Sequence, residues 1–432
     1  MSLFSSLRVR NYRLFAAGQV VSLTGTWGQR VAQDWLVLGL SHNSGTAIGL
    51  TTGLQFAPTL LLTLYGGVLA DRYPKRRLLI ITQVSMGVTA LALGILDVAH
   101  VVTLWQVYLL AALLGVGSAF DTPTRQAFVS ELVDRDQLAN AVSLNSATFN
   151  TARVIGPAVA GVMISSVGTG VVFLANAASF LAVILGLALI RDGELHHTEP
   201  LPRRRGQLGE AFRYIRARPD LLMPILLVAV VGTFGFNFQI TTALLAKTTF
   251  HRGPSAYGLL STAIASGSLI GALLAARRAR PRDALVFGSC IAFGVLEVVA
   301  GVMPSYLTFL ILLIPTGVAA LTFTTAANAT VQLGASPAMR GRVMAVYVLV
   351  FLGGTPFGAP IVGWVAQTFG ARWSLIIGGV LCAVAAVATG LALVRARQLR
   401  IEPHLLRRRP HVHLRPMLGG DFVATYDEAR PA

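Results

Sequence analysis

Long apolar runs, separated by short polar segments, repeat about twelve times along the chain. A bilayer core about 30 Å thick needs roughly 20 apolar residues per helix, and backbone groups in lipid must be paired within the protein. The pattern therefore predicts an all-α integral membrane protein with about twelve transmembrane helices. The expected spans are residues 13–39, 45–70, 78–99, 102–121, 139–166, 170–191, 222–247, 255–277, 283–303, 305–330, 342–368 and 373–394.

Composition supports this class. Of the 432 residues, 54% are hydrophobic and 12% are charged, whereas a soluble domain carries roughly 25% charged residues. Arg8, Arg10 and Arg13 precede a first apolar run that is long enough to stay in the membrane, so we expect a first span rather than a cleaved signal peptide. Cys290 and Cys382 lie inside apolar runs, which favours packing over disulfide or metal chemistry.

The placement of basic residues predicts the orientation. Thirty of the 35 Lys and Arg residues fall on the side of the termini, against Lys247, Arg252 and Arg372 outside and Arg30 and Arg153 within spans. Cytoplasmic loops carry such an excess, so we expect both termini in the cytoplasm at the plasma (inner) membrane. The same bias accounts for the net charge of +17 without a nucleic-acid partner.

A polar segment divides the spans into six and six. It contains Pro200, Pro202 and three consecutive arginines, and it predicts a cytoplasmic linker. We therefore expect an N-terminal six-helix half, a linker, a C-terminal six-helix half and a basic tail. Their bounds are 1–191, 192–220, 221–394 and 395–432.

The two halves echo each other in sequence. The glycines of GPAVAGVMISSVG (Gly156, Gly161, Gly168) and of GAPIVGWVAQTFG (Gly358, Gly363, Gly370) match at one offset, and Gly-Thr-Trp-Gly at 25–28 matches Gly-Thr-Phe-Gly at 232–235. Parallel repeats place a transporter's substrate site at their interface near mid-membrane. The alternative is chance similarity between helices rich in Gly and Ala.

The segment GGVLADRYPKRR between the second and third spans resembles the signature loop of the Major Facilitator Superfamily. Six residues fit that signature, and Pro74 stands where the family usually has glycine. The segments LRVRNYRLFAAGQ, GTWGQRVAQDWLVL, FDTPTRQAFV and RGRVMAVYVLVFLGGTPFG resemble its proton-coupled branch of enterobactin exporters and macrolide-efflux proteins. The fitting residues are Gly67, Asp71, Arg72, Lys75, Arg76 and Arg77.

This resemblance implies efflux by alternating access and a cytoplasmic gate. Asp71, Arg76, Asp121 and Arg125 would form a charge latch with the start of the span at 342–368. A few ion pairs can bias two states that differ by a few kcal/mol. The alternative is positive-inside topology alone, which explains the arginines but not Asp71.

The first span carries a polar stripe. Ser22, Thr26, Arg30 and Asp34 recur at intervals of four, and Gln19, Gln29 and Gln33 widen the stripe. Facing lipid, each central charge would cost about 2.5–3.5 kcal/mol, so the stripe should face a cavity or partner helices. Arg30 and Asp34 can pair across one turn. Either Asp34 exchanges protons with Arg30 tuning it, or the two form a static ion pair.

Other spans hold further polar candidates. Asn150 and Arg153 share a face of the fifth span, where Arg153 could be a functional charge or a structural anchor. Glu297 is either a second coupling site or the partner of a neighbouring helix. The resemblance also implies that neutral side chains of the seventh and tenth spans line the cavity. These are Asn237, Gln239, Thr324 and Asn328.

Three functions fit the sequence. The first is proton-coupled export of amphipathic small molecules of drug or siderophore type. The second is a lipid or lysolipid translocase, and the third is a scaffold or sensor that uses its basic tail. No P-loop, zinc motif or nucleophile elbow is present, so we expect neither an enzyme nor a cofactor. We expect a small-molecule substrate, protons and the bilayer as partners, with no nucleic acid and no obligate protein partner. The tail carries eight arginines together with His404, His411 and His413. These histidines invite a metal site, but a solvated segment attracted to anionic lipid is the favoured interpretation.

Overall fold

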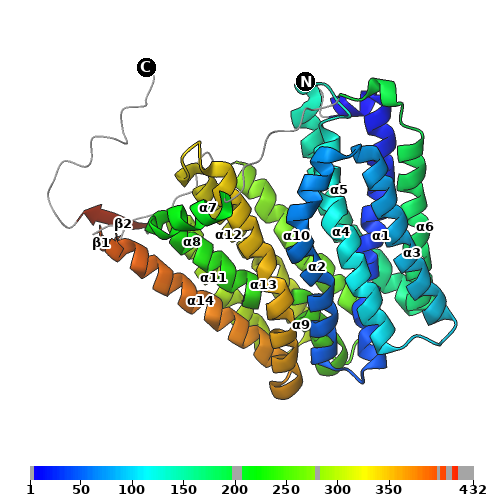
Figure 1. Cartoon of the computed structure of the whole chain (residues 1–432). Helices are drawn as coiled ribbons and strands as arrows, with labels where there is room; N and C mark the ends of the chain where they lie inside the picture. The colour runs from blue at the N-terminus through cyan, green and yellow to red at the C-terminus, as the bar shows by residue number, and fades with distance from the viewer. Residues whose placement is uncertain (1–3, 197–206, 278–282, 397–398, 405–410, 417–432) are drawn as a thin grey trace.

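The computed structural model describes residues 4–196, 207–277, 283–396, 399–404 and 411–416, apart from a few side chains that include Asp71. Helices account for nearly all of the described chain (Figure 1). The N-terminal helices are α1 (Arg10–Leu40), α2 (Gly45–Arg72), α3 (Lys75–Val98), α4 (Leu104–Val129), α5 (Arg135–Val167) and α6 (Thr169–Ala188). The later long helices are α8 (Pro219–Val230), α10 (Pro254–Ala276), α11 (Asp283–Gly301), α12 (Tyr306–Gly334), α13 (Arg340–Phe369) and α14 (Ala371–Ala396).

The remaining elements are short. The 3₁₀ turns η1 (Ser5–Arg8) and η2 (Asp192–Glu194), the linker helix α7 (Gln207–Arg216), and the segments η3 (Val231–Gly235), α9 (Phe238–Leu244) and η4 (Leu245–Thr249) complete the helical part. Strands β1 (Leu399–His404) and β2 (His411–Pro416) pair antiparallel in the tail and are the only departure from an all-α fold among the described residues.

The helices agree with the predicted spans to within a few residues, except at the end of α4, which continues to Val129. Within the described part of the chain, ten spans are both long and apolar enough to cross a membrane. Helices α1 and α2 are not among the ten, but their 31 and 28 residues exceed the roughly 20 that a bilayer core requires. The all-α membrane fold is confirmed, and the count of twelve rests on length alone for these two helices.

Local sequence sets the helix ends. The Ser44 hydroxyl accepts a hydrogen bond from the Ala47 amide at the start of α2, and Ser305 does the same at the start of α12. Gly168 and Gly370 follow α5 and α13 with φ of 84° and 100°, a region that glycine enters without the cost a Cβ brings.

The seventh predicted span, 222–247, is one stretch that the structure interrupts. Helix α8 passes into the π-helical segment η3, the backbone breaks at Phe236 and Asn237, and α9 then leads into a second π-helical segment, η4. The Asn237 amide donates to the Thr233 carbonyl (2.8 Å), which satisfies one of the freed backbone groups. Such interruptions occur in membranes where the backbone lines a cavity or is covered by protein.

The most extensive packing between the N-terminal and the C-terminal helices is that of α2 along α13 and of α5 along α10. At Gly45 an added Cβ would lie 2.6 Å from the Gly363 carbonyl oxygen, and at Gly161 it would lie 2.9 Å from the Pro254 carbonyl oxygen. Glycines here let the backbones approach closely.

These contacts gather at one end of the molecule. Gly45 opens α2 directly after α1 ends, and α1 is about 46 Å long at 1.5 Å per residue, so Gly45 lies far from the N-terminus. Figure 1 shows the two groups of helices converging at the end opposite the N-terminus and diverging toward the N-terminus and α7.

The sequence echoes occupy matching places. Gly156 of α5 packs against Trp27 in the Gly-Thr-Trp-Gly segment of α1, and Gly358 of α13 packs against Thr233 in the Gly-Thr-Phe-Gly segment of η3. In each half, the repeated segments thus form a close contact between the first and the fifth span of that half. This placement supports the interpretation of the chain as two repeats.

The linker helix α7 docks on the C-terminal helices. The Tyr214 hydroxyl accepts hydrogen bonds from the Ser336 amide (3.2 Å) and the Arg218 guanidinium (2.9 Å), and Arg342 of α13 pairs with Glu210 (2.6 Å). The bonds with Ser336, aided by Arg218, hold the pKa of Tyr214 below its usual value.

Candidate functional site

The polar stripe of α1 is buried against protein. Gln19, Ser22, Gln29, Gln33 and Asp34 are each less than 5% exposed. Two of these side chains bond to neighbouring helices. The Gln33 amide donates to Gln55 of α2 (3.1 Å), and Gln29 accepts from Asn176 of α6 (2.5 Å). Within this stripe the two glutamines therefore anchor α1 inside its own half, while Asp34 has a different partner.

Asp34 bonds across the two groups of helices. Its carboxylate accepts a hydrogen bond from the hydroxyl of Tyr257 on α10, at 2.6 Å. Tyr257 is fully buried, its ring stacks on Trp35 of α1 with centroids 6.3 Å apart, and its hydroxyl also lies 3.4 Å from the Gln239 carbonyl oxygen. A carboxylate held in a membrane segment thus sits in the contact that joins α1 to α10.

Arg30 does not pair with Asp34. Among the described side chains no ion pair joins the two; the Arg30 guanidinium instead lies over Trp27 (4.5 Å to the ring centroid) and Phe56 (5.6 Å). Arg153 of α5 lies over the same Trp27 ring at 5.8 Å. The ion pair predicted across one turn is not recorded at contact distance in this structure, although the two charges still interact electrostatically; aromatic faces contact the guanidinium and a tyrosine bonds the carboxylate.

A cavity of about 280 Å³ lies between the two groups of helices. Residues of α1, α5, α9, α10, α12 and α13 line it, so both halves contribute to one chamber. The charged and aromatic lining side chains are Arg30, Arg153, Trp27, Phe236, Phe238 and Phe351. The neutral polar ones are Gln239, Thr242, Ser261, Ser268 and Thr324.

The other predicted pathway residues lie outside this chamber. Asn150 bonds to the Ser146 carbonyl in its own helix (2.8 Å), and neither it nor Gln33 lines the cavity. Glu297 is 2% exposed on α11, and its Oε2 atom has no hydrogen-bond partner among the described residues. Of the implied neutral residues, Gln239 and Thr324 line the cavity, whereas Asn237 and Asn328 do not.

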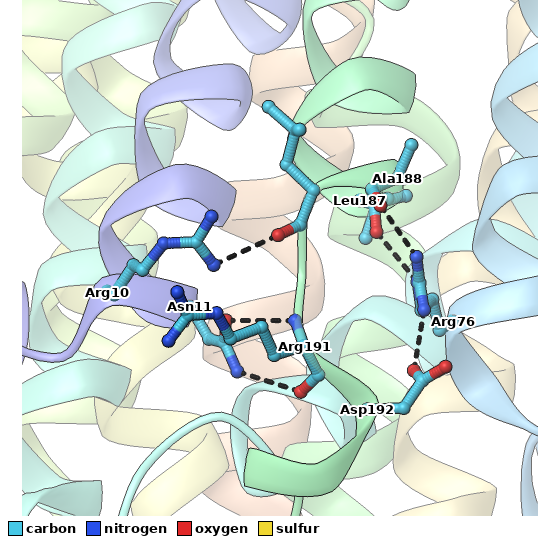
Figure 2. A network of polar contacts seen from close by, with 8 residues as sticks. Arg10, Asn11, Arg76, Leu187, Ala188, Arg191 and Asp192 are labelled. Carbon is cyan, nitrogen blue, oxygen red and sulfur yellow. Dashed lines mark hydrogen bonds and ion pairs between the residues drawn. The ribbon is translucent and has the colours of Figure 1, made fainter.

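The predicted gate residues make contacts inside the N-terminal half. Arg76 donates to the Leu187 and Ala188 carbonyls (2.7 and 2.8 Å) and pairs with Asp192 (2.6 Å), so it caps the end of α6 (Figure 2). Beside it, Asn11 exchanges two hydrogen bonds with the Arg191 backbone.

The remaining gate candidates also stay local. Asp121, buried on α4, accepts from Gln83 (2.7 Å) and Thr82 (3.1 Å) and pairs with Arg125 (3.3 Å). Gly67 is half-buried and Arg72 exposed on α2, and the Asp71 side chain lies outside the described part of the structure. No described gate side chain has a recorded bond to α13, so the latch stays a prediction for another conformation.

Sequence reasoning missed Tyr257 and the stacking role of Trp27. Tyr257 is an isolated tyrosine in an apolar run, and nothing along the chain marks it as the partner of a residue 223 positions away. Trp27 was visible inside the Gly-Thr-Trp-Gly echo, but the two arginines that flank its ring come from different helices.

Comparison with known proteins decides the family. The family described as "Transmembrane secretion effector" matches residues 1–415. The chain belongs to this family of Major Facilitator Superfamily transporters. The resemblance inferred from the signature loop is thereby confirmed, and the chain is a multi-pass membrane protein of this family.

Curated relatives include transporters of several kinds. The staphyloferrin A transporter of Staphylococcus aureus is 28% identical over 61% of this chain, and the match spans only about two thirds (66%) of that relative's length. The multidrug efflux pump Tap of Mycobacterium tuberculosis is 25% identical, covering 89% of this chain and 91% of Tap. Macrolide efflux protein A of Streptococcus pyogenes is 22% identical, covering 93% and 100%.

Solved structures share the fold. A bacterial homologue of the lysosomal transporter Spinster, inward-facing and occupied, superposes with a TM-score of 0.70 at 18% identity, covering 89% of this chain and 97% of that one. A bacterial homologue of the iron transporter ferroportin, also inward-facing, gives 0.71 at 16% identity, covering 90% and 99%. At these identities the likeness establishes the fold alone.

Proposed function

We propose that the protein exports amphipathic small molecules in exchange for protons, by rocking its two halves about the central cavity. The observation that carries this proposal is the hydrogen bond from Tyr257 to the buried carboxylate of Asp34, which joins the halves beside the cavity. Drug and macrolide efflux pumps among the relatives, and a siderophore transporter, support a small-molecule substrate.

The division into halves, at 1–191 and 221–394 with a linker between them, is part of this proposal. So is the cytoplasmic location of both termini, which rests on the distribution of basic residues. With the termini inside the cell, the closed end formed by α2 with α13 and α5 with α10 is the outer end, and the geometry is inward-facing.

Protonation would act on the outer closure through Asp34. A hydrogen bond to an ionised group contributes about 1.5–3 kcal/mol, and one between neutral groups about 0.5–1.5 kcal/mol. A proton on Asp34 therefore weakens the link between α1 and α10 and biases the equilibrium between the two states. Arg30, which lies over aromatic rings, lines the cavity one turn away.

Uptake into inverted vesicles under an imposed proton gradient tests the proposal. A panel of lipophilic cations, macrolides, siderophores and aromatic carboxylates is offered to wild type, Asp34→Asn and the control Asp136→Asn, whose carboxylate is exposed at the start of α5. We expect gradient-driven accumulation in wild type and the control, and its loss in Asp34→Asn. Unchanged accumulation in Asp34→Asn would reject Asp34 and direct attention to Glu297, a second carboxylate buried within a helix.

A lipid translocase is less well supported. The crevice between α2 and α13, about 220 Å³, is the opening that a lipid chain would use. Its lining consists of Leu, Ala, Gly, Pro and Phe side chains and offers no polar side chain to a headgroup. Transport that depends on lipid headgroup in vesicles would favour this alternative.

A further inference from the structure

The side chains that line the central cavity carry positive charge, and Asp34, the acid that acts electrostatically on Arg30, lies outside this lining. Its charged lining residues are Arg30 and Arg153, and none of the residues that line it is Asp or Glu. Asp34, one turn from Arg30, has its carboxylate bonded to Tyr257 and is not among the lining residues. A chamber built for lipophilic cations would need the opposite charge balance, because like charges repel strongly where water is scarce.

The two guanidinium groups have few partners of their own. Both lie over the ring of Trp27, which brings two like charges to one indole. The Nε atom of Arg30 is buried without a hydrogen-bond partner among the described residues, and the one recorded bond of Arg153 is a long one to the Ser268 hydroxyl (3.5 Å). Each guanidinium has five N–H donors, so most donors at this site have no recorded hydrogen bond to the described residues.

The rest of the cavity is aromatic and aliphatic. Phe236, Phe238 and Phe351 lie on the C-terminal half, facing the helices that carry the arginines. A ligand that fits both features has an anionic group for the guanidinium pair and a flat apolar body for the phenylalanines. The planar guanidinium fork matches a carboxylate in both geometry and charge.

We propose that the transported substrates are amphipathic carboxylates, bound with the carboxylate between Arg30 and Arg153 and the apolar body toward the phenylalanines. This inference rests on the proposed function, since it names the substrate class of the same cavity. The aromatic contacts of Arg30 and Arg153 position the two charges before the ligand arrives, which lowers the ordering cost of binding.

Binding to the purified full-length protein tests the charge preference. The probes are dansyl-phenylalanine, its uncharged amide, and a dansyl amine of similar size that is cationic at neutral pH; their affinities are read from dansyl fluorescence. We expect the carboxylate to bind at least tenfold more tightly than the amide and the amine to bind most weakly. Equal binding of the three probes, tighter binding of the amine, or no carboxylate binding would overturn the proposal.

Variants locate the preference. We expect Arg30→Gln and Arg153→Gln each to weaken carboxylate binding about tenfold or more while changing amide binding little. Arg30→Lys should keep only part of the preference, because it keeps the charge but loses the planar, ring-stacked fork. The control Arg216→Gln removes an exposed arginine of α7 and should bind like wild type. A preference for the carboxylate that survives in both glutamine variants would place its origin outside this cavity and reject the assignment.

The test separates this inference from the function on which it rests. Arginine-dependent carboxylate binding without gradient-driven transport would support the substrate class and refute proton-coupled export. Gradient-driven export of the amine that persists in Arg30→Gln would support export and refute the substrate class.

Discussion

Replacing Tyr257 with Phe should open the end of the molecule opposite the start of α1. The substitution removes only the hydroxyl, so the ring can keep its stack on Trp35 while the Asp34 carboxylate loses its donor at 2.6 Å. A hydrogen bond to an ionised group is worth about 1.5–3 kcal/mol, which is about a 10- to 150-fold change in an equilibrium. An open state at about 1% in wild type would rise to about 10–60%.

Spin labels across the closed end report this shift. Thr46 of α2 and Arg252 before α10 are exposed and belong to different halves, so cysteines placed there can carry the labels. The native Cys290 and Cys382 are fully buried and should not react with the label. Electron–electron resonance distances should show a longer population that grows in Tyr257→Phe.

A matched control isolates the link between the halves. The Tyr306 hydroxyl donates to the Ala256 carbonyl (3.0 Å), a contact between α12 and α10 within one half. Tyr306→Phe should leave the label distances as in wild type. If Tyr257→Phe is folded and its distances match those of Tyr306→Phe, the bond to Asp34 does not hold the closed end, and the reasoning fails.

Two further predictions concern packing and a buried ion pair. At Gly49 an added Cβ would collide with the Ala359 carbonyl, so Gly49→Leu should block closure of α2 on α13 and lengthen the same label distances; Gly39→Leu, at an exposed position with no neighbour within 4 Å, should not. Lys75→Ala should lower the free energy of unfolding by about 3–5 kcal/mol, because it leaves the buried carboxylate of Glu131 without its partner at 2.6 Å. Arg191→Ala, which removes an exposed ion pair, should lower it by at most about 1 kcal/mol. Thermal unfolding compares the two variants, and equal melting temperatures would contradict the distinction.

The sequence predicts the helices well because each span is a local pattern. A run of about 20 apolar residues carries its own evidence, and the caps at Ser44 and Ser305 lie within a few residues of the helices they start. The interruption of the seventh span is harder to foresee, because Phe236 and Asn237 sit in an apolar stretch with no proline at the break.

The site is less predictable because its contacts join distant segments. The polar stripe identifies Arg30 and Asp34, and their spacing on one helix predicts that they pair with each other. In the structure Arg30 contacts the ring of Trp27 and Asp34 bonds to Tyr257, and the spacing along the stripe indicates neither partner. Arg76 shows the same limit: the motif marks it, and its partners at the end of α6 lie more than 100 residues away.

Proton movement driven by substrate tests the central claim most directly. Purified protein is reconstituted in proteoliposomes that contain a pH-sensitive dye, and a substrate gradient is imposed with no initial pH difference. We predict that wild type moves protons against the direction of substrate flow and that Asp34→Asn moves none. Substrate flow in wild type without any change of internal pH, or equal proton movement in Asp34→Asn, would contradict the account.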